Sequence, residues 1–148
     1  MLTTTLIRLF ERDLQKLSNE ISLYKDEDKL WLVKPGISNS AGNLCLHLIG
    51  NLNHFIGATL GHTGYVRYRD DEFSLKNIPR QDLLINIENI KLIVKEVVSS
   101  LPEADLQKDF PSEIFGKKDS TGFILIHLAT HLTYHLGQIN YHRRLLDP

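Results

Sequence analysis

Four segments of about 20 residues repeat apolar side chains every three or four positions, and this pattern constrains the fold more than any other feature. The segments span residues 4–24, 40–60, 79–101 and 120–146, the last beginning at Ser120 or Thr121. A 3-4 spacing places apolar side chains on one face of an α-helix, and no period-two alternation bounded by turns is present. Because each helix must bury its apolar stripe against the others, we expect an all-α fold built as an up-down four-helix bundle.

The length and charge of the chain limit its domain count and its partners. Its 148 residues fit one domain spanning residues 1–148, and its net charge of −1, with Lys and Arg spread along the sequence, predicts no nucleic-acid surface. No apolar run approaches the ~20 residues of a membrane span, and the N-terminus lacks a signal-peptide pattern. We therefore expect a cytoplasmic protein with no membrane partner. The single cysteine excludes an intrachain disulfide and a zinc site built from thiolates.

Histidines are frequent, and two of them have the spacing of a metal-binding pair. The chain has seven, of which four fall between residues 127 and 142. His131 and His135 are four positions apart, so on a helix their imidazoles lie within roughly 40° of each other and about 6 Å apart along the axis. Neutral imidazole is the commonest metal ligand. Zinc-like ions take three or four protein ligands, so a further ligand must come from another segment.

A third inward-facing histidine lies on the second helical segment. His47 falls among Leu44 and Leu48 on the apolar face and is expected to face the interior of the bundle. Cys45, two residues earlier, lies about 200° round the helix and is interpreted as a packing residue. His54 shares the face of His47 but lies about 10 Å along the axis, too far to share one ion with bonds of about 2.0–2.1 Å.

Spacing alone leaves two ligand pairs open on the last helical segment. His127 and His131 are also four residues apart, so the 127/131 pair competes with the 131/135 pair, whereas His142 is too remote from His135 to share an ion. The same histidines can also be explained without a metal. An inward histidine such as His47 is often a hydrogen-bonded core residue, and a single HxxxH pattern occurs by chance. Three inward histidines on two helices favour a metal, because burying them without a partner is unfavourable.

The run HLTYHLGQINYHRRLL, which contains His131, His135 and Gln138, resembles the last-helix signature of the DinB-like superfamily, the DNA-damage-inducible protein family. The stretch SNSAGNLCLHLIGNLNHFI resembles that family's second helix, and VRYRDDEF resembles the basic-acidic segment that follows it in one branch. The resemblance spans nearly the whole chain. It implies a four-helix bundle with a long crossover connection, and a divalent ion held by one histidine of the second helix and two of the last. Those positions fall on His47, His131 and His135, with His127 one turn before the site.

The resemblance also implies a class of reaction. Characterised proteins similar to this fold include transferases and isomerases that use low-molecular-weight thiols. We therefore expect a metal-dependent enzyme of the thiol-S-transferase type, with zinc or nickel as the ion, a small thiol and an electrophile as partners, and His127 and Gln138 as candidate catalytic residues. The alternatives are a metal-hydroxide hydrolase, a metal-stabilised binding or stress-response module without catalysis, and a plain helical bundle whose histidines are incidental.

A homodimer is expected mainly from the same resemblance. Apolar residues of the third segment lie on more than one side, because Leu84 and Val98 fall outside the stripe that contains Leu83 and Ile87. A helix that is apolar beyond one stripe often has a second partner. A wide surface facing the core is the alternative explanation.

Overall fold

The computed structural model describes all 148 residues, and they form an all-helical protein. In chain order the elements are α1 (Leu2–Leu23), η1 (Glu27–Trp31), α2 (Ala41–Leu52), η2 (Asn53–Leu60), α3 (Arg69–Ser74), α4 (Arg80–Ser100), η3 (Glu103–Gln107) and α5 (Thr121–Leu146). The predicted all-α class is confirmed. The one pairing of extended backbone is an isolated bridge between Asp109 and Ser120.

The four long helices correspond to the four predicted segments, with two differences. The second segment changes from α-helix to π-helix at Asn53, so α2 and η2 share it. The connection after it, predicted to be irregular, contains the short helix α3. The starts of α2 and α5 lie where the sequence places them, because Ser40 Oγ accepts the N–H of Asn43 at 3.1 Å and Ser120 Oγ accepts the N–H of Phe123 at 3.2 Å.

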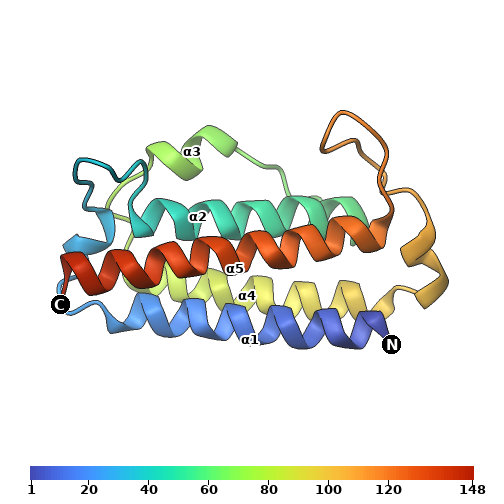
Figure 1. Cartoon of the computed structure of the whole chain (residues 1–148), viewed down its shortest axis with the longest axis horizontal. Coiled ribbons are helices and arrows are strands. Elements are labelled where there is room, and N and C mark those ends of the chain that lie inside the picture. Colours follow the sequence, from blue (N-terminus) through green and yellow to red (C-terminus); the bar gives the residue numbers. More distant parts are fainter.

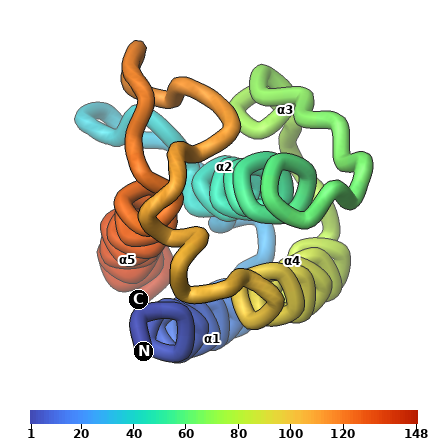
Figure 2. Tube along the Cα trace, turned by 90° about the vertical axis from the view of Figure 1, so that its right-hand side faces the viewer, coloured from blue at the N-terminus to red at the C-terminus, as the bar shows by residue number.

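The four long helices lie side by side, and α1 and α2 each pack against both α4 and α5 (Figures 1 and 2). The N–H of Leu2 donates to the Glu103 carboxylate at 2.7 Å, so the start of α1 meets the end of α4. The N–H of Lys25 donates to Asp147 at 2.5 Å, so the ends of α1 and α5 meet. Therefore α1 runs antiparallel to α4 and parallel to α5.

A long crossover connects two parallel helices of the bundle. Figure 1 shows α2 and α4 running in the same direction, and residues 61–79 carry the chain back along α2 with α3 on its outer side. The long crossover implied by the resemblance is therefore present. Because the long helices α2 and α4 follow each other in the chain and run in the same direction, the predicted up-down alternation of the four helices is not confirmed.

Thirty buried apolar residues form one core between the long helices. Those of α1 follow the predicted 3-4 spacing: Leu6, Phe10, Leu14, Leu17 and Ile21. On α4, Val98 is fully buried and Leu84 packs against the core, so these two residues outside the predicted stripe face the core and give no support to a dimer. None of the helices is both long and apolar enough to cross a bilayer.

Candidate metal centre

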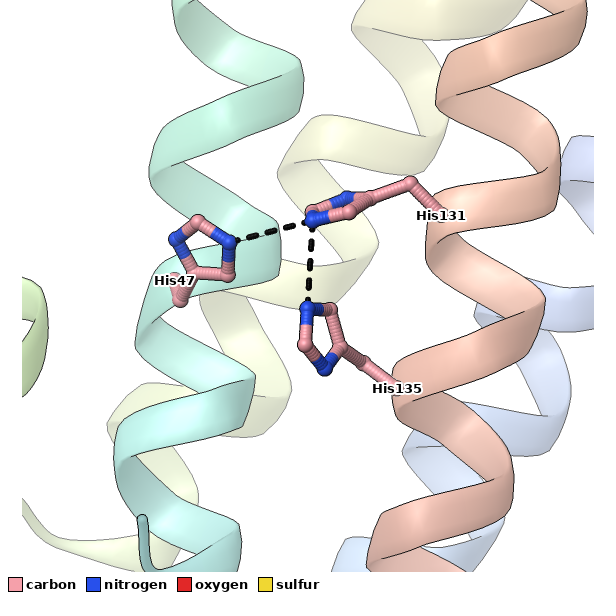
Figure 3. Close-up of side chains that lie close together, drawn as sticks. All are labelled: His47, His131 and His135. Carbon is pink, nitrogen blue, oxygen red and sulfur yellow. Dashed lines mark hydrogen bonds between the residues drawn. The ribbon is translucent and has the colours of Figure 1, made fainter. Parts of the chain in front are cut away.

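The side chains of His47, His131 and His135 converge between α2 and α5 (Figure 3). The Nε2 atom of His131 lies 3.2 Å from Nε2 of His47 and 3.1 Å from Nε2 of His135. One ligand atom from each of the three residues lies within 4.8 Å of the other two. Tetrahedral bonds of about 2.0–2.1 Å hold ligand atoms about 3.3 Å apart, so these imidazoles are spaced to hold one divalent ion. Of the two pairs left open by spacing, 131/135 is the one that His47 joins.

Hydrogen bonds on the far side of two rings direct their lone pairs towards this centre. Nδ1 of His47 lies 3.0 Å from Glu72 Oε1, and Nδ1 of His135 lies 2.7 Å from Gln138 Oε1. Carboxylate and amide oxygens only accept hydrogen bonds, so each Nδ1 carries the proton and each Nε2 is left with a free lone pair. Nδ1 of His131 is buried and has no partner in the protein.

Burial favours the neutral form of two of the three imidazoles. Together with the nearby His135 and His47, it lowers the pKa of His131 to about 3. Burial also lowers the pKa of His135, although the hydrogen bond to Gln138 opposes this shift. Metal ions bind the neutral imidazole, so the site favours the form that a cation needs. Nε2 of His131 lies 3.1–3.2 Å from the Nε2 atoms of both neighbours and, as a neutral imidazole, can donate a hydrogen bond to only one of them at a time. A divalent cation would be bonded by all three nitrogens at once.

The crossover contributes a buried ion pair that contacts His47. Arg67 Nε donates to Glu72 Oε2, and Arg67 Nη2 donates to Glu72 Oε1, both at 2.9 Å. Burial opposes ionisation of Glu72, but the hydrogen bonds from His47 and Arg67 outweigh it, and the pKa of this carboxyl lies below its ordinary value. No helical or metal-ligand pattern predicted either residue as part of the site. The one sequence signal was the resemblance of VRYRDDEF to a family segment.

Gly50 makes room for this carboxylate on α2. It lies one turn after His47, and a Cβ at this position would overlap the carboxylate of Glu72. Only a residue without a side chain therefore allows Glu72 to reach Nδ1 of His47. The second helix thus supplies both the ligand and the space for the group that orients it.

The remaining histidines and the cysteine lie outside the triad. His127 is half-buried, with its ring 6.0 Å from that of His131 and 4.8 Å from that of Phe115, measured between centroids. His142 is structural, since its Nδ1 accepts from Tyr24 at 2.7 Å and its Nε2 donates to the Leu32 carbonyl oxygen at 2.8 Å.

Cys45 is fully buried, and burial raises the pKa of its thiol to about 12. This agrees with its interpretation as a packing residue.

A cavity borders the triad on the side of His135. Its volume is about 470 Å³, and it lies between the loop that precedes α2 and the second half of α5. The lining contains no Lys, Arg, Asp or Glu and consists of Gly36, Ile37, Ser38, Asn39, Leu44, Tyr134, His135, Gln138, Tyr141, His142 and Leu145. The centre is therefore next to a space that admits a small organic molecule.

The fold and the histidine cluster together define an all-helical protein with a candidate three-histidine metal centre. The chain belongs to the family described as a protein of unknown function, DUF1572, which matches residues 3–147. No curated protein matches the chain. The family carries no assigned reaction, so the function has to be argued from the site.

Proposed function

We propose that this protein is a divalent-metal-dependent enzyme of the thiol-S-transferase type, with the ion held by His47, His131 and His135. The observation that carries the proposal is the convergence of three imidazole Nε2 atoms, His131 Nε2 lying 3.1 and 3.2 Å from the others, beside an open cavity. Three protein ligands leave a coordination position for a substrate, as in catalytic zinc sites. The resemblance to the DinB-like superfamily supports the same class of reaction.

The chain's own residues would hold the ion, orient its ligands and accept the proton of the thiol. A bound zinc or nickel ion supplies Lewis acidity, which lowers the pKa of a nearby thiol towards neutrality. In the transfer the thiol sulfur bonds to an electrophilic carbon, the leaving group departs with its bonding electron pair, and the thiol proton passes to a base. His127, one turn from the triad, is the proposed base. Gln138, whose Oε1 lies 2.7 Å from His135 Nδ1, fixes the orientation of that ligand.

The cavity beside His135 favours an uncharged electrophile. Its walls combine apolar and aromatic side chains with the neutral groups of Ser38 and Asn39, and no Lys, Arg, Asp or Glu lines it. Away from the ion, an anionic group of a substrate would meet no counter-charge in these walls, which is unfavourable in a partly desolvated site. Cys45 is buried with a raised pKa and is no nucleophile, so the thiol is a cosubstrate.

Metal content and thiol dependence test the proposal together. The wild-type protein should bind about one zinc or nickel ion per chain, and His131→Ala should lose it, whereas His54→Ala, which alters a histidine outside the triad, should keep it. With a small thiol and the neutral electrophile 1-chloro-2,4-dinitrobenzene, turnover should disappear when chelator is added. Full metal occupancy in His131→Ala would overturn the ligand assignment. Turnover that needs the metal but no thiol would indicate a hydrolase instead.

We also propose that the protein is a homodimer and that α5 forms the contact. An exposed row of apolar and aromatic side chains follows one side of this helix: Phe123, Ile126, Tyr134, Tyr141 and Leu145. Twofold dimers are the commonest soluble oligomers, and such a row matches a copy of itself. Light scattering at micromolar concentration should give twice the chain mass of 17.0 kDa, and a monomer mass would reject the dimer.

A further inference from the structure

The crossover between η2 and α4 holds a carboxylate that touches the metal centre without being a ligand. We infer that Glu72 is a positioning residue for His47, and that through this contact the docking of the crossover and the binding of a divalent ion are coupled. The inference rests on the proposed metal centre and adds the residue that orients one ligand, together with the segment that responds to the ion.

Burying the charge of Glu72 costs free energy, and the ion pair with Arg67 alone does not explain why the carboxylate lies beside His47. Its side chain is only 7% exposed and that of Arg67 11%, so both charges have been taken out of water. Buried ion pairs are often no more stable than apolar residues of the same volume, so the pair is weak evidence for a purely stabilising role. The same carboxylate oxygen that Arg67 Nη2 reaches at 2.9 Å also lies 3.0 Å from Nδ1 of His47.

The crossover has a separate anchor, which leaves the Glu72 side chain free for another role. The side-chain amide of Asn43 donates to the backbone carbonyl oxygens of Glu72 and Leu75, at 3.0 and 2.8 Å. Lys76 contacts the Asn43 oxygen in turn. Backbone docking of α3 on α2 is therefore provided by Asn43, while the carboxylate is aimed at His47.

The chemical effect on His47 follows from the hydrogen bond. An acceptor at Nδ1 fixes the tautomer with its lone pair on Nε2, holds the ring plane and makes the ring a more basic ligand. Arg67 keeps the carboxylate at Nδ1. Arg67 Nη2 is itself only 3.5 Å from Nδ1 of His47, so without the Glu72 charge a cation would face the ligand and oppose binding of an ion.

Coupling between the ion and the crossover follows from thermodynamic reciprocity. If the docked Glu72 raises the affinity of the centre for an ion, the bound ion must stabilise the docked crossover by the same factor. Residues 67–75 should therefore exchange their backbone amide hydrogens more slowly when zinc is bound. By the same coupling, displacement of the crossover from α2 would weaken binding of the ion by that factor.

The test compares two carboxylates that each pair with an arginine, of which only Glu72 contacts a histidine of the centre. Glu72→Gln cannot satisfy both neighbours, because its amide group turns a donor towards either His47 or Arg67. Glu20→Gln is the matched control. Glu20 on α1 accepts a hydrogen bond from Arg143 Nε on α5 at 2.7 Å, and it touches no histidine of the triad. Zinc affinity is measured by competition with a chromophoric chelator, and the His47 tautomer by ¹⁵N NMR of the imidazole nitrogens.

We expect Glu72→Gln to weaken zinc binding by about 10- to 100-fold and to lose the pure Nδ1–H tautomer, while Glu20→Gln stays within about twofold of wild type. Should Glu72→Gln fold poorly, the double variant Arg67→Gln/Glu72→Gln, which leaves no unpaired cation, must give the same loss. Zinc affinity within about threefold of wild type in these variants, or an equal loss in Glu20→Gln, would overturn the inference. A wild-type protein that binds no zinc would instead overturn the metal centre itself, so the two failures are distinguishable.

Discussion

Replacing Gly50 by alanine tests the contact between α2 and the crossover at a single atom. A Cβ at this position would occupy the space of the Glu72 carboxylate. Glu72 must then leave its place, because α2 is fixed on its other sides by the core. Its departure removes the hydrogen bond at 3.0 Å from His47 Nδ1 and both contacts with Arg67.

The expected cost exceeds the intrinsic gain from alanine. Breaking a buried ion pair by displacing one partner costs about 3–5 kcal/mol. Alanine in a helix interior is favoured over glycine by about 1 kcal/mol. We therefore expect Gly50→Ala to lower the free energy of unfolding by about 2–4 kcal/mol. Zinc binding should weaken as well, because His47 loses the acceptor at Nδ1.

Gly137→Ala provides the matched control on α5. No atom lies within 4 Å of a Cβ built there, so the helix-propensity gain should appear alone and stabilise the protein by about 0.5–1 kcal/mol. Urea unfolding in the presence of chelator measures the free energy of unfolding of both variants, which should fall in Gly50→Ala and rise in Gly137→Ala. If Gly50→Ala proved as stable as wild type, with unchanged zinc affinity, the packing of Glu72 against α2 would be refuted.

Three further predictions follow from the buried polar groups. Burial raises the pKa of Glu20, but hydrogen bonds from Arg143 and Asn140 outweigh it and lower the pKa overall, so its stabilisation is present above about pH 4.5 and is lost at lower pH. The difference in urea stability between wild type and Glu20→Gln should therefore shrink between about pH 6.5 and about pH 3.5, and a difference independent of pH would contradict this. Burial raises the pKa of the Cys45 thiol to about 12, so this thiol should resist iodoacetamide until the protein unfolds. Cys45→Ser should leave turnover unchanged. Rapid alkylation of Cys45 in the native protein would contradict its interpretation as a buried packing residue. Tyr24→Phe leaves Nδ1 of His142 without its donor and should cost about 1–3 kcal/mol in urea unfolding, whereas an unchanged midpoint would show that this hydrogen bond is dispensable.

The sequence by itself determined the helices and the residue types that can bind a metal. Helix formation depends on local spacing, so the 3-4 apolar pattern predicted the long helices to within a few residues, and the expected starts at Ser40 and Ser120 are helix caps in the structure. The spacing of His131 and His135 is also local, and it placed both imidazoles on one face of α5 before any fold was known. The single cysteine likewise excluded a zinc site built from thiolates.

Only the tertiary structure decided which groups meet across helices. The rotation and axial position of α2 against α5 bring His47 to the 131/135 pair and leave His127 one turn away. The spacing of residues within one helix carries no information on how that helix is rotated or shifted against another. The same holds for Glu72, which lies 25 residues from His47 in the chain but 3.0 Å from its Nδ1. A six-residue helix such as α3 is too short to show a period, and its charged residues resemble a solvated loop. Of these residues Glu72 is buried, and its burial depends on a contact with Gly50, because the missing side chain creates a space that exists only when the crossover packs against α2.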